Sequence, residues 1–478
     1  MRYFTFILVA LFFITGCKSR QQKSEATGSI VTEPRVQKDL EEIKEDGVLK
    51  AIVVYGGTSY FLYRGQAMGY EYELLKRFAD HLDLELEVVI AHNMDEIISL
   101  LNKGEGDLIG HGMTITQERR NYVDFSDYVY LTQQVLVQRK PDNWRQMKRH
   151  EIQRELISSP VELIGDTVSV RKNSSYYHRL QNLQEEIGGR IHIDTISGDV
   201  PTDEIIKKVV NGEVEYTIAD KNIAEINSSY FPILDVSTEI SFSQRIAWAA
   251  RKNSPDLLQE LNEWIKQMRK QTDYYVIYNK YFKNQRSFRA RVESDFYSKN
   301  SGMISKYDDI VKNYASKIGW DWRFVSSVIY QESQFNPKSQ SWAGARGLMQ
   351  IMPPTARELG IKDVTDPEDN IRGGTRYLKQ MWNRWEEIPD SVQRMKFTLA
   401  SYNCGYGHVK DAQQLAEKKG KDPKIWDESV RKYLLKLSYP EYYNDNVVRY
   451  GYVRGVEPVT YVKQIMDRYV HYRDLIPS

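Results

Sequence analysis

One glutamate, Glu332, stands in a sequence context that suits acid catalysis. It follows Val328 by one turn of a predicted helix, on the same face. Burial among apolar groups disfavours the charged form of a carboxyl group and raises its pKa, so that it can hold and donate a proton near neutral pH. A surface glutamate, or a buried one paired with an arginine, is the plainer alternative. The apolar stripe before it consists of Phe324, Val325, Val328 and Ile329.

The elements around Glu332 are predicted from local signals. The helix should end soon after the glutamate, because Pro337 cannot continue the hydrogen-bond ladder. The next segment, SWAGARGLMQ at 341–350, is rich in small residues, so its backbone can approach a bulky substrate closely. A further helix is expected to begin at Pro353 or Pro354. We therefore expect Glu332 to face a cleft.

Four ordered motifs in this region resemble those of the family 1 lytic transglycosylases, which have a goose-type lysozyme-like fold. They are ESQFNPKSQS at 332–341, GARGLMQIMPPTA at 344–356, SYNCGYG at 401–407 and a late YV at 461–462. The resemblance implies that the chain is a lyase acting on the glycan strands of peptidoglycan, with Glu332 as its catalytic acid.

Cleaving a glycosidic bond requires protonation of the leaving oxygen while positive charge builds at the anomeric carbon. The usual scheme uses two carboxylates, and no acidic residue of the matched motifs stands in an obvious partner position. The resemblance implies another route at the bond between N-acetylmuramic acid and N-acetylglucosamine. The substrate's own 6-hydroxyl attacks, ionised Glu332 accepts its proton, and a 1,6-anhydro end results.

The same resemblance implies which side chains bind the substrate. Ser341 and Gln350 would orient its N-acetyl and neighbouring groups. Tyr402 would hydrogen-bond near the glutamate, and Asn403 would shape the same turn. In the fourth motif Tyr461 takes the family's tyrosine position, although EPVT replaces the usual Glu-Thr pair there.

The first half of the chain shows a different pattern. Short apolar runs such as VLKAIVV at 48–54 alternate with amphipathic helical stretches such as 70–82, which predicts an α/β domain with a largely parallel sheet. A later turn carries the hydroxyl of Thr114 and the guanidinium of Arg119, groups suited to gripping a carboxylate. A surface arginine is the plainer alternative.

Three segments here resemble the family 3 periplasmic solute-binding proteins that bind amino acids. They are GYEYELLKRFADHLDLEL, GDLIGHGMTITQERRNYVDFSDYVY and GEVEYTIAD. The resemblance implies that Gly112, Thr114 and Arg119 meet the α-carboxylate of an amino acid or peptide, and that Asp220 meets its α-ammonium. A domain that keeps the fold as a spacer, with an emptied pocket, is the alternative.

The first 17 residues, MRYFTFILVALFFITGC, have the parts of a secretory signal peptide: a basic start, a short apolar run and small residues at the end. The ending resembles a bacterial lipobox, which implies that Cys17 is acylated and tethers the protein to a membrane by lipid. Lys18 is not the aspartate that retains some lipoproteins at the inner membrane, which favours the periplasmic face of the outer membrane. An uncleaved anchor or an ordinary signal peptide is the alternative.

Composition limits the remaining choices. Lys plus Arg number 66 against 65 Asp plus Glu, so the net charge of +1 implies no attraction to nucleic acid. The two cysteines allow no disulfide framework if Cys17 carries lipid, and the eight histidines show no metal-ligand spacing. We therefore expect no cofactor and no metal.

A chain of 478 residues should hold two or three domains. We expect a multidomain protein: an N-terminal α/β two-lobed solute-binding fold, then a mainly α lysozyme-like fold. Two rival functions remain, a hydrolytic muramidase and a non-enzymatic solute-binding or sensor lipoprotein. The expected segments are a signal peptide at 1–16, a flexible tether at 17–40, the binding domain at 41–285, a connector at 286–300 and the catalytic domain at 301–478. Lobe 1 should cover about 47–137 and 236–285, and lobe 2 about 138–235.

Overall fold

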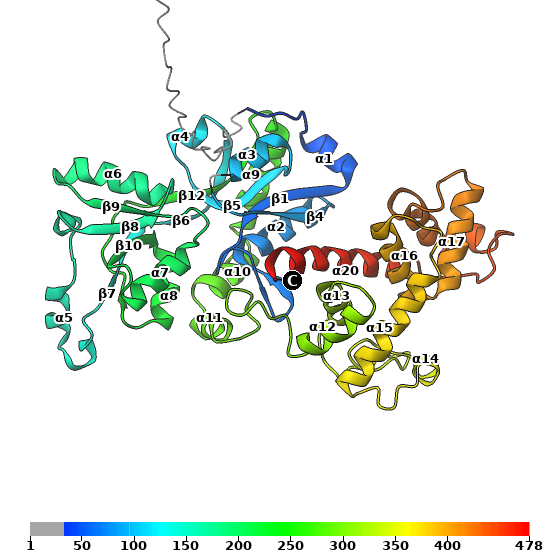
Figure 1. Ribbon diagram of the computed structural model, residues 1–478. Coiled ribbons are helices and arrows are strands. Elements are labelled where there is room, and N and C mark those ends of the chain that lie inside the picture. Colours follow the sequence, from blue (N-terminus) through cyan, green and yellow to red (C-terminus); the bar gives the residue numbers. More distant parts are fainter. Residues whose placement is uncertain (1–32, 95, 478) are drawn as a thin grey trace, which may run out of the picture.

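The computed structural model describes residues 33–94 and 96–477, so the expected signal peptide and Cys17 lie outside the described residues. Figure 1 shows two lobes built on sheets and, beside lobe 1, a helical domain. The expected fold class, a two-lobed α/β domain followed by a mainly α domain, is confirmed.

Lobe 1 contains a five-stranded sheet in the order β4-β1-β5-β12-β6. Strand β1 pairs in parallel with β4 and β5, whereas β12 pairs antiparallel with β5 and β6, so the sheet is mixed. Both faces of β1 are buried, because Leu49 and Val53 pack in one apolar cluster and Ile52 and Val54 in another. The strands are β1 (Val48–Val54), β4 (Glu85–Ala91), β5 (Leu108–Thr114), β6 (Asp124–Thr132) and β12 (Gln244–Ala250).

Helices cover this sheet, and a small hairpin projects from it. The helices are α1 (Leu40–Asp46), α2 (Tyr70–His81), α3 (Ile97–Lys103), α4 (Gln117–Arg120), α9 (Pro255–Met268) and α10 (Thr272–Phe282). The hairpin, β2 (Phe61–Tyr63) and β3 (Gln66–Met68), is antiparallel and lies outside both five-stranded sheets.

Lobe 2 contains a second five-stranded sheet in the order β11-β7-β10-β8-β9. Strand β7 begins at Gln134, so the chain enters this lobe four residues before the expected boundary at 138. The strands are β7 (Gln134–Arg139), β8 (Thr167–Arg171), β9 (His192–Ile196), β10 (Tyr216–Asp220) and β11 (Leu234–Asp235). The helices are α5 (Arg149–Glu155), α6 (Ser175–Ile187), α7 (Thr202–Asn211) and α8 (Lys221–Tyr230), with 3₁₀ turns at Trp144–Gln146 and Pro160–Leu163.

Two segments expected to link domains, the flexible tether and the connector, make defined contacts. Residues 35–38, expected in the tether, contact lobe 1 through the backbone amide of Arg35, which donates to Asn102 O at 2.8 Å. The expected connector contains helix α11 (Gln285–Val292), and its Arg291 is buried beneath the rings of Phe61 and Tyr281. Aromatic rings can stabilise a buried guanidinium through cation–π contacts. Because of this, the many charged residues of the segment did not indicate that it forms a packed helix.

The C-terminal domain is helical and has its own apolar core. Helix α13 is capped at its start by Asp321 and at its end by Gln334, which adopts left-handed angles, a common way for a helix to stop. The helices are α12 (Asp308–Lys317), α13 (Trp322–Ser333), α14 (Pro353–Glu358), α15 (Pro367–Asn383), α16 (Ser391–Cys404), α17 (Tyr406–Lys418), α18 (Arg431–Lys436), α19 (Pro440–Tyr443) and α20 (Val456–Leu475), with a π-helical turn at Trp426–Val430.

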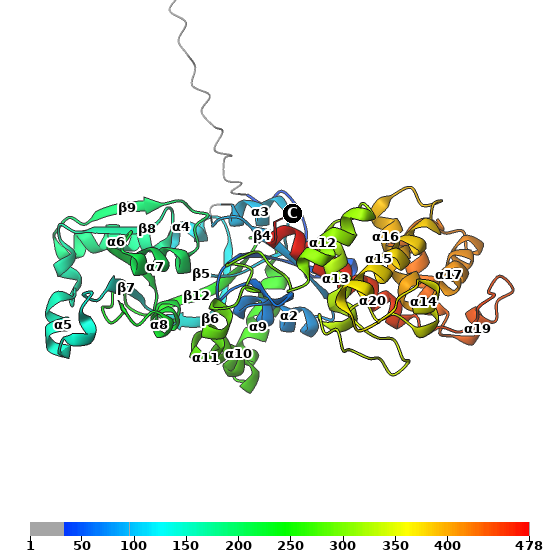
Figure 2. The same ribbon diagram turned by 60° about the horizontal axis from the view of Figure 1, so that its bottom comes forward.

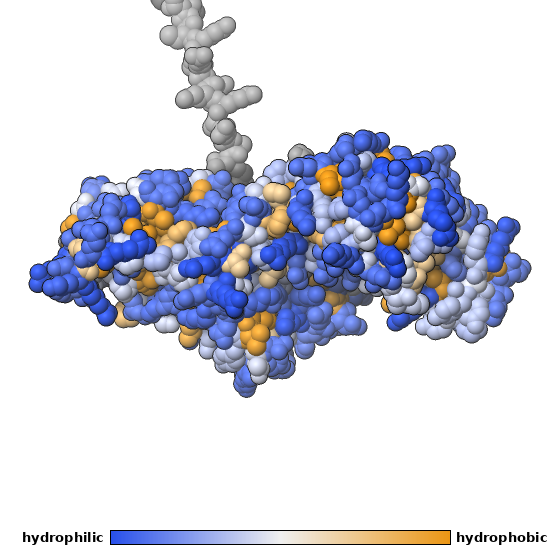
Figure 3. All heavy atoms as spheres, turned by 90° about the horizontal axis from the view of Figure 1, so that it is seen from below, coloured by the Kyte–Doolittle hydropathy of each residue, from blue (hydrophilic) through white to orange (hydrophobic). Residues whose placement is uncertain are grey.

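Helix α20 joins the two halves of the molecule. Figures 1 and 2 both place it between lobe 1 and the other helices of the C-terminal domain. Its Lys463 forms an ion pair with Glu85 of β4, with Nζ and Oε2 3.3 Å apart. The view from below shows apolar side chains scattered in small groups over a largely hydrophilic face (Figure 3).

Candidate functional site

Glu332 lies in the last turn of α13, one turn beyond the fully buried Val328, as the sequence predicted. Its carboxyl is partly buried, and the hydroxyl of Tyr461 on α20 donates a hydrogen bond to Oε1 at 2.5 Å. Burial raises the pKa of Glu332 to about 7, although the hydrogen bond from Tyr461 acts in the opposite direction. Both protonation states are therefore well populated at neutral pH.

Two tyrosines, the buried Tyr461 and the partly buried Tyr402, lie near this carboxyl. Burial raises the pKa of the Tyr461 phenol well above its ordinary value, so it stays a proton donor at neutral pH. The pKa of Tyr402 is also raised, first by burial and then by the charge of Glu332. Its hydroxyl donates to Met349 O at 2.7 Å, so Tyr402 anchors the loop beside the glutamate and is not the donor to it.

An open groove runs beside Glu332, and Asn403 and Tyr461 line it as expected. Sequence reasoning missed its other polar residues. One face of α20 carries Glu457, Tyr461 and Gln464, because they lie three to four positions apart. This helical spacing is the sequence signal that could have identified Glu457 and Gln464 as groove residues. Glu457 thus places a second carboxyl on the groove. The residues that line it are Gln331, Glu332, Asn403, Arg454, Val456, Glu457, Thr460, Tyr461 and Gln464.

The other two expected substrate-binding residues, Ser341 and Gln350, are tied into the loop that follows α13. The amide of Ala345 donates to Ser341 Oγ at 3.0 Å. The side-chain amide of Gln350 donates to Ser339 O at 3.0 Å and to Gly347 O at 2.8 Å. Neither is among the residues that line the groove beside Glu332, so this structure gives them a role in holding the loop.

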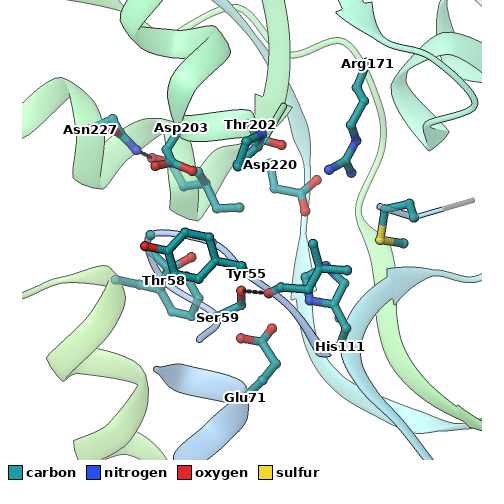
Figure 4. Close-up of a pocket in the computed structure, with 18 of the residues that line it drawn as sticks. Tyr55, Thr58, Ser59, Glu71, His111, Arg171, Thr202, Asp203, Asp220 and Asn227 are labelled. Atoms are coloured by element: carbon teal, nitrogen blue, oxygen red, sulfur yellow. Dashed lines mark hydrogen bonds between the residues drawn. The ribbon is translucent and has the colours of Figure 1, made fainter. Parts of the chain in front are cut away.

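A second site lies between the two lobes of the binding domain. Gly112, Thr114, Arg119 and Asp220 all line this one cavity, so the structure brings together the four residues expected at a ligand. Arg119 donates from Nη1 to Thr114 O at 3.0 Å. The cavity also contains Glu71, His111, Arg171, Thr202 and Asp203, which sequence reasoning missed (Figure 4).

Titratable side chains line this cavity. Burial raises the pKa of Asp220 to about 7 and that of Glu71 to about 7. Oxygen Oδ1 of Asp220 is buried and accepts no hydrogen bond, and Arg171 lies beside this carboxylate in Figure 4. Burial lowers the pKa of His111 to about 3, so it is neutral. An acceptor without a donor fits a ligand that brings a positive charge or an N–H group.

The connector supplies part of the cavity wall. Phe288 and Val292 of α11, and Tyr297 after it, line the cavity. The Lys299 ammonium is buried and contacts Asp203 of lobe 2 at 2.8 Å. The pocket is therefore completed by a segment that leads directly into the C-terminal domain.

Comparisons with known proteins agree with this architecture. Residues 309–425 match the Transglycosylase SLT domain family, and residues 52–284 match the Bacterial extracellular solute-binding proteins, family 3. A relative from Desulfosudis oleivorans, membrane-bound lytic murein transglycosylase F, is 35% identical over 435 residues, covering 91% of this chain and 92% of the relative. Proteins of the same name from Aliivibrio fischeri and Shewanella loihica are 31% and 32% identical; they cover 97% and 98% of this chain and 88% and 92% of their own lengths.

The chain belongs to the membrane-bound lytic murein transglycosylase F family. The expected enzyme class, a lytic transglycosylase, is confirmed.

Solved structures resemble the binding domain of this family member. An ancestral amino acid-binding protein, a precursor of cyclohexadienyl dehydratase, is 26% identical and covers 51% of this chain and 99% of its own, with a TM-score of 0.42. The holo form of ArgBP from T. maritima is 25% identical and covers 50% of this chain and 97% of its own, with a TM-score of 0.40.

Residues 33–94 and 96–477 show neither a metal-ligand cluster nor a membrane-spanning helix. They contain no cluster of three or more His, Cys, Asp or Glu side chains that could hold a metal ion. Nor do the helices in these ranges include one with the length and apolar character to span a membrane.

Proposed function

We propose that this transglycosylase cleaves the β-1,4 bond between N-acetylmuramic acid and N-acetylglucosamine in peptidoglycan, and that it leaves 1,6-anhydro-N-acetylmuramic acid ends. The observation that carries the proposal is the Glu332 carboxyl, whose pKa of about 7 lets it act both as an acid and as a base. The open groove beside it, lined by polar side chains such as Asn403 and Gln464, is where the glycan strand would lie.

The reaction uses Glu332 twice. In the first half, protonated Glu332 gives its proton to the glycosidic oxygen, and the bond from that oxygen to the anomeric carbon breaks. In the second half, the 6-hydroxyl of the same sugar attacks the anomeric carbon, and the Glu332 carboxylate takes its proton. The Tyr461 hydroxyl stabilises the ionised carboxylate between these halves, because it is a donor 2.5 Å from Oε1.

Digestion of purified sacculi tests this proposal. Mass analysis should find anhydro ends, which are lighter than reducing ends by one water. Glu332→Gln should abolish their formation, because an amide can neither donate nor accept the required proton. Full activity in Glu332→Gln would refute the assignment of the catalytic acid.

A hydrolytic muramidase is the second candidate, and one observation favours it. Glu457 lines the same groove as Glu332 and supplies the second carboxyl that a hydrolase uses to activate water. If Glu457 plays that part, the products carry reducing ends and Glu457→Gln abolishes activity. Anhydro ends, together with an active Glu457→Gln variant, would exclude it.

We further propose that the cavity between the lobes binds an amino acid or a peptide released from the cell wall, and that this ligand regulates the enzyme. Gly112, Thr114 and Arg119 would hold its α-carboxylate. Asp220 would pair with its α-ammonium, and its unpartnered Oδ1 supports that assignment. Calorimetry of the full chain with free amino acids and cell-wall peptides tests binding, and Asp220→Asn should weaken it. Absence of binding to all of these would leave the spacer alternative.

We also propose that acylated Cys17 tethers the protein to the periplasmic face of the outer membrane. The support is the lipobox-like sequence and the words "membrane-bound" in the names of the relatives. Cys17→Ser should move the protein from the membrane fraction to the soluble fraction, and density-gradient separation identifies the membrane. A Cys17→Ser variant that stays in the membrane fraction would contradict lipid anchoring.

A further inference from the structure

The β2–β3 hairpin of the binding domain reaches into the catalytic domain. Leu62 of β2 is buried in the apolar core of the helical domain. The turn of the hairpin is formed by Arg64 and Gly65, both with left-handed angles. The hydroxyl of Tyr472, on α20, donates to Gly65 O at 2.6 Å.

The turn fits closely at Gly65. A Cβ atom added there would lie 2.6 Å from Tyr472 Oη and 3.0 Å from ring carbons of Tyr330 and Phe335. All three are parts of the catalytic domain, and the Tyr472 hydroxyl that lies nearest is already held by its hydrogen bond. Because φ of Gly65 is +75°, a left-handed angle that side chains rarely adopt, any larger residue is disfavoured both by the backbone and by the contacts.

The helices touched by this turn carry the catalytic pair. Tyr330 lies on α13 two residues before Glu332, and Tyr472 lies on α20, the helix of Tyr461. Arg468 of α20 spans the two helices: its guanidinium lies over the Tyr330 ring at 4.3 Å from the centroid. Its Nη1 also donates to Gln331 Oε1 at 3.1 Å. A shift of α20 against α13 would therefore change the contact between Tyr461 and Glu332.

The base of the hairpin also makes defined contacts, with the connector and through the loop that precedes β2. The loop before β2 supplies Tyr55, Thr58 and Ser59 to the cavity between the lobes. On its outer side, β2 pairs with the connector, because Ser298 N donates to Leu62 O at 3.0 Å and Arg64 N donates to Phe296 O at 2.9 Å. The hairpin is thus fixed at both ends, which makes its turn a rigid support for α13 and α20.

We infer that Gly65 is a positioning residue for the transglycosylase reaction, because the β2–β3 turn sets the spacing of α13 and α20 and so keeps Tyr461 in contact with Glu332. The inference gives the binding domain a part in catalysis that needs no ligand between the lobes. It rests on the proposed roles of Glu332 and Tyr461.

Gly65→Ala in the full chain tests it. We expect kcat to fall about tenfold while KM changes by less than about twofold, since an ångström-scale displacement of catalytic groups mainly affects the chemical step. The alkaline limb of the pH–rate profile should move in the same direction as in Tyr461→Phe. Tyr472→Phe, which removes only the hydrogen bond to Gly65 O, should show a smaller effect of the same kind.

Gly319→Ala is the matched control. Gly319 has φ of +73, and a Cβ added there meets no atom within 4 Å, so this variant pays a similar backbone cost without a collision. It should lose stability while keeping its kcat and pH profile. If Gly65→Ala matches Gly319→Ala in kcat and pH profile, the inference is overturned. If Gly65→Ala does not fold, an unchanged kcat in Tyr472→Phe overturns it. Activity remaining in Glu332→Gln would instead refute the proposed function.

Discussion

The Tyr461 hydroxyl lies 2.5 Å from Oε1 of Glu332, although 129 positions separate the two residues in the chain. The two side chains come from different helices, α20 and α13, which pack against each other beside the hairpin turn at Gly65. The acid strength of the glutamate is therefore set by tertiary packing: burial raises its pKa, and the tyrosine moderates that rise.

The pH dependence of the reaction should follow Glu332. The general acid must be protonated, so kcat/KM should fall as pH rises through the pKa of about 7, by a factor of ten for each further pH unit. A rate profile on sacculi or a soluble glycan from pH 4 to 9 measures this. If the rate instead begins to fall near pH 4.5, the ordinary pKa of a glutamate, burial does not set the pKa of Glu332.

Tyr461→Phe should change both the rate and this profile. Without the hydroxyl, the ionised carboxylate loses a donor, so the pKa of Glu332 rises and the alkaline limb moves to higher pH. We expect kcat to fall about tenfold, because the carboxylate formed between the two half-reactions is less stable. Tyr469→Phe, on the same helix, removes a hydrogen bond to Asp321 and should leave the limb in place.

Glu332→Gln should stabilise the folded protein at high pH while abolishing activity. A buried carboxyl with a raised pKa costs folding free energy only where it is ionised. That cost is absent below about pH 4.5, grows as pH rises, and is complete above about pH 7. Urea unfolding should show Glu332→Gln more stable by about 2 kcal/mol at pH 8, a value discounted because the carboxyl opens onto solvent.

The control for this effect is Glu428→Gln, because Glu428 is an exposed carboxylate that pairs with Lys432 at 3.0 Å. Its substitution should change the free energy of unfolding by less than about 0.5 kcal/mol at both pH 5 and pH 8. Equal effects of the two substitutions at pH 8 would argue against a burial cost at Glu332.

Gln350→Ala should loosen the loop that follows α13. The Gln350 amide donates to two backbone carbonyls, of Ser339 and Gly347, and its loss leaves both without that donor. We expect a loss of about 1–2 kcal/mol in the free energy of unfolding and a fall in kcat/KM. Gln340→Ala, at an exposed position of the same loop, should change neither. Unchanged stability in Gln350→Ala would contradict the loop-holding role.

Much of the local structure could be predicted. The stripe leading to Glu332 places it on the buried side of α13, and Asp366 followed by Pro367 marks the start of α15, where Asp366 accepts from Asp369 N. Such signals act between residues a few positions apart, through hydrogen bonds and fixed backbone angles. They can therefore be recognised from the sequence without the tertiary structure.

Other segments depended on distant contacts. Helix α11 lacks a clean apolar period, because its buried Arg291 is held by rings of Phe61 and Tyr281 far away in the chain. The Asp203 carboxyl in the lobe cavity pairs with Lys299, which lies 96 positions away in the chain. A local sequence pattern cannot predict contacts between residues that lie so far apart in the chain.

The sequence by itself predicted the two fold types and the helix that carries Glu332, the proposed acid. Only the tertiary structure decided that Tyr461 donates to this acid, that Tyr402 instead binds Met349 O, and that Glu457 shares the groove. It also decided that the hairpin turn at Gly65 lies against Tyr330 of α13 and Tyr472 of α20. The physical reason is range: backbone preferences act between neighbours, whereas burial and side-chain hydrogen bonds depend on which surfaces the folded chain brings together.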